Sequence, residues 1–450
     1  MFKNLNNPNS YNVFDIKRFF EFLRESSILS YHLNYFKQGI YFIIMSNLCV
    51  KCRGKGFCGK PCRILEGLKT KMPKIKTHFS GSTPPEVFVG RVGYPEVFSG
   101  VLAPVEKGET AGFSLPEDWV RKNLSIEQIL DMRGRMIYAR TKMNIKIPNK
   151  IKQVTQELAL SSKPVSTEFF LKKAPVFEFS ASRYFQIMSN PAPIQKIILE
   201  ENPKVEKKVD YITGDYDVKA TDAVLELYNS NIITSHLQKL LATGLLGVKV
   251  QRKMVPTRWS ITAVDDMIGK KLLEKVRTYG QLNEIQLFHY YYNGNNFELL
   301  FLPENFSFEV IEVSMPGNVW AVSQTKSATK AHVMQDYEGF YGRKTYAENV
   351  AGGYYADRLA AVEYLERIKR QATVLLFHEE REEYYAPLGV GIIRESLRNA
   401  LKEKPEKPAT VQEALEIIGK RVKYPLKKYK EKSWILNNYG KQKKLGEFFL

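Results

Sequence analysis

The residues with the clearest chemical potential are four closely spaced cysteines. Cys49, Cys52, Cys58 and Cys62 lie within 14 residues and are the only cysteines in the chain of 450. Thiolates at such short spacings converge tetrahedrally on one Zn²⁺ ion, and the glycines between them permit the tight turns that a zinc knuckle requires. We therefore predict that these cysteines bind Zn²⁺ as a cofactor.

A pair of disulfides is the alternative for these cysteines. Disulfides are typical of small secreted domains, whereas this is a large chain with no further cysteine and no recognisable secretory leader. Five basic residues and no acidic one surround the cluster. Their charge either balances an anionic zinc–thiolate centre or contacts nucleic-acid phosphates, and the sequence leaves both open.

A second candidate site is a polar stretch in the middle of the chain. Arg252, Lys253, Arg258 and Trp259 combine cations with an indole ring that could stack on a base, so we expect them to bind nucleic acid. The alternative is a buried Arg–Asp network that braces a domain, because arginine readily forks onto carboxylates. Three lysines near the C-terminus are further candidates for nucleic-acid binding: Lys427, Lys428 and Lys430.

Several carboxylates could support phosphoryl transfer by holding a metal ion. They are Asp215, Asp217, Asp265, Asp266 and Glu309. Aspartates before a helix also occur because they favour the positive end of the helix dipole, so this signal is weak. Glu309 and Glu312 are three residues apart and would face opposite sides of a strand, so only one could join a shared site. No histidine lies near a cysteine or another nucleophile, and we find no hydrolase triad.

The composition indicates a folded, basic protein. A chain of 450 residues with 44% apolar residues is long enough for two or three domains. Lys and Arg number 67 against 48 acids, which gives a net charge of +19 and makes nucleic acid the leading partner class. A lysine-rich composition without such a partner is the alternative. Much of the excess lies between Lys420 and Lys444, where ten basic residues face one acid.

Hydrophobic periodicity and turn signals predict the elements that position these residues. The first helices are expected from Ser125, with a capping box completed by Gln128, over 220–243, and from Asp265, with Thr262 as its cap. Successive antiparallel strands are then expected over 285–292, 297–302 and 306–313. A helix over 356–372, strands over 373–378 and 388–393 and a helix over 394–401 complete the prediction. We predict an α+β fold with a four-cysteine zinc knuckle on a mixed α/β core with antiparallel strands, a C-terminal α/β region and a flexible basic tail.

Residues 1–44 differ from the rest of the chain. They are rich in Phe and Tyr, and their apolar stretch is too short to span a bilayer. We therefore expect no membrane association and a cytoplasmic, nucleoid-associated location. Our hypothesis is that translation begins at Met45 and that 1–44 is a non-native or disordered extension. An aromatic helix around Asp15–Arg24 is the alternative.

Several long motifs carry a resemblance to a known family. Besides the cysteines, they are Pro84–Pro95, Val255–Asp266, Gly342–Lys344 and Gly352–Tyr355. In these motifs the chain resembles, over 45–450, the archaeal Nre proteins associated with DNA repair. The resemblance implies a zinc finger over 45–75, an N-terminal α+β domain over 76–322, a C-terminal domain over 334–432 and a tail over 433–450 that docks on the sliding clamp PCNA. The resemblance does not say whether the protein has an enzymatic activity, and residues 1–44 have no counterpart in it.

The tail has the chemistry of such a docking peptide. Gln442, Leu445, Phe448 and Phe449 fit the pattern Gln-x-x-apolar-x-x-aromatic-aromatic. One helical turn would gather the three apolar side chains into a plug, while Gln442 reaches a polar pocket. The alternative is that the tail folds back and hides its aromatic rings. Lysines before the motif favour an accessible peptide.

These observations predict a DNA damage repair factor that binds DNA and is recruited through PCNA by a C-terminal motif. One alternative is a metal-dependent nuclease, or another phosphoryl-transfer enzyme acting on DNA, that uses the five carboxylates named above. Another is an RNA-binding zinc protein of the translation apparatus, which would share the positive charge but has no use for a clamp peptide.

Overall fold

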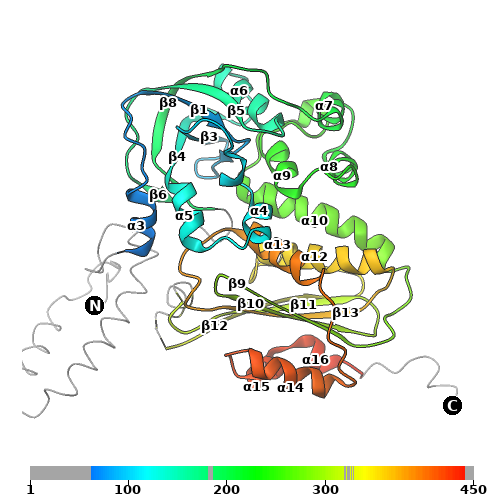
Figure 1. Ribbon diagram of the computed structural model, residues 1–450. Helices are drawn as coiled ribbons and strands as arrows, with labels where there is room; N and C mark the ends of the chain where they lie inside the picture. The colour runs from blue at the N-terminus through cyan, green and yellow to red at the C-terminus, as the bar shows by residue number, and fades with distance from the viewer. Residues whose placement is uncertain are drawn as a thin grey trace, which may run out of the picture.

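The computed structural model describes residues 62–180, 186–318, 321, 325, 327 and 329–440. These residues form an α+β fold in which a layer of helices separates two mixed sheets (Figure 1). Cys49, Cys52 and Cys58 lie outside the described residues, and so does the whole predicted docking motif, Gln442 to Leu450. The zinc knuckle and the clamp peptide therefore stay predictions.

The first sheet has six strands and is mostly antiparallel, with one parallel pair between β4 and β8. In order across the sheet they are β1 (His78–Thr83), β5 (Val165–Leu171), β8 (Pro191–Leu199), β4 (Met136–Asn144), β3 (Glu96–Pro104) and β2 (Val87–Val89). β5 alternates buried and half-buried residues, the period-two pattern of a strand with one face on a core. A small hairpin joins β6 (Phe179–Ser180) to β7 (Met188–Ser189).

The second sheet has five strands. Their order is β12 (His332–Glu338), β11 (Ser307–Ser314), β13 (Thr373–Glu380), β10 (Asn295–Leu302) and β9 (Gln286–Tyr292). The three central strands are buried throughout, because helices cover both faces of the sheet. The predicted hairpin of β9 and β10 is confirmed, with Asn293 and Gly294 in the turn at φ 48° and 83°.

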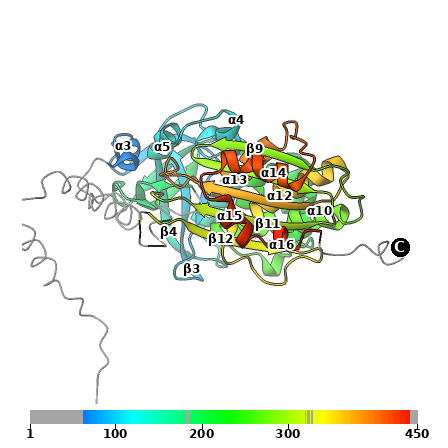
Figure 2. The same ribbon diagram turned by 90° about the horizontal axis from the view of Figure 1, so that it is seen from below.

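Helices form layers on either side of the second sheet (Figures 1 and 2). The layer between the sheets contains α8 (Ala220–Asn229), α9 (Thr234–Ala242), α10 (Thr257–Val276), α12 (Gly352–Ile368) and α13 (Val390–Ala400). The opposite face carries α14 (Val411–Arg421), α15 (Leu426–Lys432) and α16 (Trp434–Asn438). The remaining helical segments are α3 (Arg63–Lys69), η1 (Ala111–Phe113), α4 (Pro116–Arg121), α5 (Ile126–Gly134), α6 (Lys150–Leu160), α7 (Lys207–Gly214) and η2 (Lys249–Gln251).

Some predicted elements are confirmed and others are wrong. The capping box holds, since Gln128 N donates to Ser125 Oγ and Ser125 N donates to Gln128 Oε1. The single helix over 220–243 is wrong: Asn231, at φ 64°, breaks it into α8 and α9. α10 begins eight residues earlier than predicted, at Thr257, so Thr262 lies inside the helix and not at its cap.

Two strand predictions near β13 are also wrong. β11 pairs in parallel with β13 and is not the antiparallel neighbour of β10, because β13 inserts between them. The segment 388–393 is not a strand. Gly389 adopts φ 83°, and α13 begins at the next residue, where its apolar side chains face the core.

The predicted flexible tail over 433–450 is folded as far as the described residues extend. Ser433 and Ile435 are buried. The carboxylate of Glu309 on β11 accepts hydrogen bonds from Ser433 Oγ at 2.6 Å and from the backbone N atoms of Trp434 and Ile435 at 2.7 and 2.9 Å. This carboxylate anchors the N-terminus of α16 to the sheet.

Candidate nucleic-acid interface

The start of α10 presents an exposed indole ring beside the first sheet. Trp259, in the first turn, is 46% exposed. The hydroxyl of Thr257 accepts a hydrogen bond from Val89 N at 2.9 Å, which ties the helix to the end of β2. Two segments 168 residues apart in the sequence are thereby held together at this point.

The loop between β2 and β3 adds a second exposed ring. Tyr94 is 39% exposed, and its ring centre lies 5.6 Å from that of Trp259 with 54° between the ring planes. Gly93 at φ 82° gives the loop a conformation that other residues rarely adopt. The loop is therefore shaped to hold Tyr94 against the indole.

The outer face of β3 and β4 contributes a third ring and two cations. Phe98 is 48% exposed, and the Arg140 guanidinium lies 4.9 Å from its ring centre. Lys142 pairs directly opposite Phe98. Tyr94 and Phe98 are four residues apart in the chain, so the two groups of side chains are neighbours near the start of β3. We call Tyr94, Phe98, Arg140, Lys142 and Trp259 together the aromatic–cation surface. Among the described residues, neither Arg140 nor Lys142 forms an ion pair, so both charges remain available to a ligand.

Arg252 and Lys253, the two cations before α10, have different environments. Arg252 donates to the carbonyl oxygens of Gly247, Thr213 and Asp215 at 2.7, 2.7 and 2.6 Å. Burial lowers the pKa of its guanidinium. Arg252 therefore braces the end of α7 through backbone carbonyl oxygens and not through the carboxylates of an Arg–Asp network. Lys253 is exposed.

The C-terminal lysines lie elsewhere. Lys427, Lys428 and Lys430 are on α15, across the second sheet from α10 (Figure 1). Lys427 and Lys428 are exposed, and Lys430 is half-buried with its Nζ 3.5 Å from Gln412 Oε1. The predicted nucleic-acid-binding residues therefore do not form one continuous surface.

The five candidate carboxylates do not meet. Asp215 accepts hydrogen bonds from the backbone of its own turn, at Asp217 and Val218. Asp266 pairs with Arg358 and Lys270 at 2.5 and 2.7 Å. Glu309 caps α16, and Glu312 faces the other side of β11, toward Gly353 of α12, as the strand period predicts. Within the described ranges, no group of three or more His, Cys, Asp or Glu residues could hold a metal ion.

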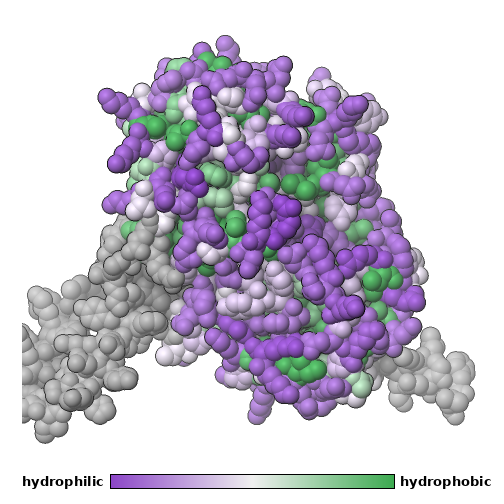
Figure 3. All heavy atoms as spheres, in the orientation of Figure 1, coloured by the Kyte–Doolittle hydropathy of each residue, from purple (hydrophilic) through white to green (hydrophobic). Residues whose placement is uncertain are grey.

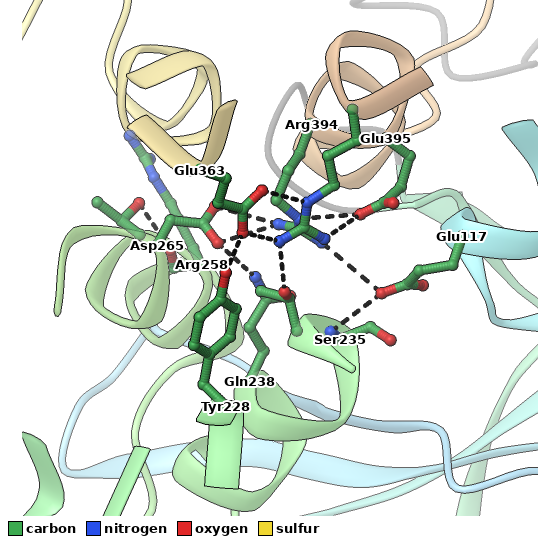
Figure 4. A network of polar contacts seen from close by, with 12 residues as sticks. Glu117, Tyr228, Ser235, Gln238, Arg258, Asp265, Glu363, Arg394 and Glu395 are labelled. Atoms are coloured by element: carbon green, nitrogen blue, oxygen red, sulfur yellow. Dashed lines mark hydrogen bonds and ion pairs between the residues drawn. The ribbon is translucent and has the colours of Figure 1, made fainter. Parts of the chain in front are cut away.

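Asp265 belongs to a buried ionic network among the helices that lie between the two sheets (Figure 4). Its carboxylate accepts hydrogen bonds from Arg394 Nη1 at 3.0 and 3.1 Å, and both side chains are fully buried. Burial raises the pKa of Asp265, and Arg394 opposes that rise. Gln238 Nε2 on α9 donates to the same carboxylate at 3.2 Å.

A second pair extends this network to α8 and α12. Arg398 donates to Glu363 at 2.8 Å through Nε, and the Tyr228 hydroxyl donates to Glu363 at 2.7 Å. Burial alone would raise the pKa of Glu363, but Arg398 and Tyr228 lower it overall. The network links five helices, so the sequence alternative of an Arg–Asp network that braces the fold holds for Asp265.

A small cavity lies between the network and the first sheet. It has a volume of roughly 40 Å³, and Ser235, Lys239, Thr257 and Gly391 are among its lining residues. Lys239 Nζ pairs with Glu86 at 3.0 Å, so the charges at its wall neutralise each other. At about 10–15 Å³ for each water molecule, the cavity suits a few waters and not a nucleotide.

Cys62 is the one predicted zinc ligand within the described residues. It is half-buried, precedes α3 and packs against the main core. α3 lies close against α5, since a Cβ at Gly134 would come within 2.9 Å of Leu68 Cα. Its free thiol sits on an anchored element and is compatible with a metal ligand.

Sequence reasoning missed four members of the aromatic–cation surface. Phe98 alternates with the buried Val97, which was a signal that its ring points outward. Its neighbours Arg140 and Lys142 required the register of β3 on β4, which no local pattern supplies. Tyr94 could be read only as a loop residue.

The described residues define an α+β protein that has exposed aromatic rings and cations near one end of its first sheet. Exposed rings beside cations are a feature of proteins that bind nucleic acid. No helix among the described residues could cross a membrane. Residues 57–321 match the family model described as "Archaeal Nre, N-terminal", and residues 338–448 match "Archaeal Nre, C-terminal". The chain belongs to the archaeal Nre family.

Three relatives support this assignment. The DNA repair protein NreB of Archaeoglobus fulgidus is 35% identical over 89% of this chain and 99% of its own length. The DNA repair protein NreA of the same organism is 36% identical over 84% of this chain and 95% of its own. NreA of Haloferax volcanii is 31% identical over 78% and 85%, respectively. No solved structure matches the chain.

Proposed function

We propose that this protein is a DNA repair factor that binds DNA and is recruited to it by the sliding clamp PCNA. The observation that carries the proposal is the similarity to relatives named DNA repair proteins, at 31–36% identity over at least 78% of this chain. The separate environments of the candidate carboxylates give no support to the alternative of a metal-dependent nuclease.

Charge supports the DNA-binding part of the proposal. The chain carries a net charge of +19, and the face seen in Figure 3 is mainly hydrophilic, with apolar side chains in small separate groups. Such a surface favours a polyanion over an apolar protein partner. Exposed lysines on α15 and Lys253 supply contacts to phosphates that are independent of base sequence.

Fluorescence anisotropy with labelled duplex DNA tests this part. Affinity should fall steeply between about 50 and about 200 mM salt, because each neutralised phosphate releases counterions. Replacing Lys427, Lys428 and Lys430 with Ala should flatten the slope of log affinity against log salt. Replacing Glu416 with Gln, which removes one negative charge from the neighbouring α14, should not flatten it. Absence of DNA binding, or tighter binding to RNA of the same length, would contradict the proposal.

Two further parts of the proposal concern residues outside the described ranges. A Zn²⁺ ion held by Cys49, Cys52, Cys58 and Cys62 would organise the segment before α3, where a closed tetrahedral thiolate shell has a structural role. The motif from Gln442 to Leu450 would bind the clamp through its apolar plug. α16 ends at Asn438 on the outer side of the second sheet, and in the sequence the motif begins two residues after Gly440.

A further inference from the structure

We infer that the aromatic–cation surface binds unpaired DNA, with bases stacked on Trp259, Tyr94 and Phe98 and phosphates held by Arg140 and Lys142. The inference rests on the proposed DNA-binding function. It adds a substrate class, single-stranded DNA or an unpaired segment within a duplex. The same surface would have little use for fully paired DNA.

The first argument for base stacking is the exposure of the three rings. Trp259, Tyr94 and Phe98 are 46%, 39% and 48% exposed, although a folded protein gains most by burying such side chains. Tyr94 and Trp259 meet at 54°, so neither ring covers the face of the other. Exposed ring faces accept a base by stacking, and every base offers such a face once it leaves the duplex stack.

The neighbouring charges carry the second step. Arg140 lies over the Phe98 ring at 4.9 Å, and Lys142 faces Phe98 across the β3–β4 ladder. Neither cation is neutralised by an ion pair among the described residues. Glu96, further along this face, accepts a hydrogen bond from Asn144 at 2.6 Å. Aromatic rings interleaved with free cations match a chain of alternating bases and phosphates better than they match an apolar peptide.

The rigidity of the surface carries the third step. Gly90 N donates to Phe98 O at 2.8 Å, and Thr257 fixes the start of α10 to β2. Gly100 lets β3 lie close against β4, because a Cβ there would come within 2.0 Å of the backbone oxygen of Ala139. A surface already held in shape loses little conformational entropy when a ligand binds.

The aromatic pair Tyr337 and Trp434 does not offer both ring faces to a ligand. Tyr337 and Trp434 stack face to face, with centres 4.7 Å apart and 10° between their planes. Each ring therefore covers one face of the other. Tyr341, which is 94% exposed, has only an edge contact with Phe340. Tyr341 is a matched control because its ring is exposed away from the aromatic–cation surface.

Anisotropy with three labelled probes tests the inference: an oligothymidylate of about 16 nucleotides, an abasic oligomer of the same length and a duplex of the same length. Trp259→Ala and Phe98→Ala should each weaken oligothymidylate binding by about 5- to 150-fold. They should change abasic and duplex binding by less than about twofold, because phosphate contacts persist. Trp259→Phe should retain most of the affinity, and Tyr341→Ala should have no effect.

The outcomes separate this inference from the proposed function. If the wild type binds duplex and single strand but Trp259→Ala and Phe98→Ala leave oligothymidylate binding unchanged, the inference is overturned and DNA binding stands. Equal losses for all three probes would show that the surface contacts only phosphates and would also overturn it. If the wild type binds none of the probes, both fail. Thermal unfolding of each variant confirms that these exposed substitutions leave the fold intact.

Discussion

His236 is a buried imidazole that couples protein stability to pH. Its Nε2 atom donates to the carbonyl oxygen of Ala159 at 2.8 Å, and the side chain lies between α9 and α6. Burial lowers the pKa of the ring to about 4, while the hydrogen bond to Ala159 opposes this change. The neutral ring is therefore the form that the folded protein retains at neutral pH.

The free energy of unfolding should fall as pH drops from about 6.5 to about 4. In this window the unfolded chain binds a proton at His236 that the folded protein does not, so stability is complete above the unfolded pKa and is lost below it. The contribution is roughly 1.4 kcal/mol per pH unit, or about 3 kcal/mol in all. Urea unfolding at a series of pH values should show a shallower decline for His236→Gln, which keeps a donor but does not titrate. Parallel curves for the two proteins would contradict this role.

Arg394 and Asp265 form a fully buried pair, so removal of one partner leaves a charge without compensation. Arg394→Met should destabilise the protein by about 3–5 kcal/mol. The double variant Arg394→Met and Asp265→Leu should recover part of this loss, because it removes both charges. Denaturant unfolding of the two variants measures the difference. A double variant less stable than the single one would show that the pair does not act as a unit.

At the scale of elements, α16 depends on one carboxylate. Glu309 accepts hydrogen bonds from the first residues of this helix. Glu309→Ala should release residues 433–440 while the rest of the fold remains, with a cost of about 1–3 kcal/mol. Hydrogen exchange should rise in α16 and stay unchanged in β13. Glu416→Gln, on the exposed side of α14, is the control, and unchanged exchange in α16 for Glu309→Ala would contradict the anchoring role.

The sequence predicted those elements whose signals are local. The β9–β10 turn, the Ser125 capping box and the strand at 373–378 each depend on residues a few positions apart. The errors arise where contacts between residues far apart in the sequence determine the secondary structure or the strand order. β13 enters between β10 and β11, Thr257 starts α10 because it bonds to β2, and Gly389 turns an apolar run into the start of α13.

The same distinction between local signals and distant contacts applies to the candidate site. Trp259 was identified from its neighbours in sequence, and the structure places it on the surface. Arg140 and Phe98 came together only through the strand register, and the α15 lysines proved to lie across the second sheet from α10. Asp265 looked like a catalytic acid in sequence because its partner, Arg394, is 129 residues away.

At the scale of the whole molecule, zinc should be bound at one equivalent per chain. Loss of any one thiolate opens the tetrahedral shell and removes much of the stabilisation that the metal supplies. Elemental analysis of freshly purified protein should show this stoichiometry, and Cys62→Ser should lower it. Less than about half an equivalent in the wild type would reject the site.

The described residues also bear on how the two proposed functions would be combined. The aromatic–cation surface is built from β3, β4, the loop before β3 and the start of α10. In contrast, α16, which precedes the docking motif in the sequence, lies on the far side of the second sheet (Figure 1). A clamp bound at the motif would therefore leave the aromatic–cation surface free for DNA. On the proposed function, this separation would allow recruitment and DNA contact in one complex.

Calorimetric titration of the full-length protein against PCNA tests the central claim of recruitment most directly. Leu445, Phe448 and Phe449 would bury three large apolar side chains at about 1.5–3 kcal/mol each. Wild-type protein should bind, and replacing both Phe448 and Phe449 with Ala should weaken binding by at least about 100-fold. Equal binding by the wild type and the double variant, or binding by neither, would contradict recruitment through this motif.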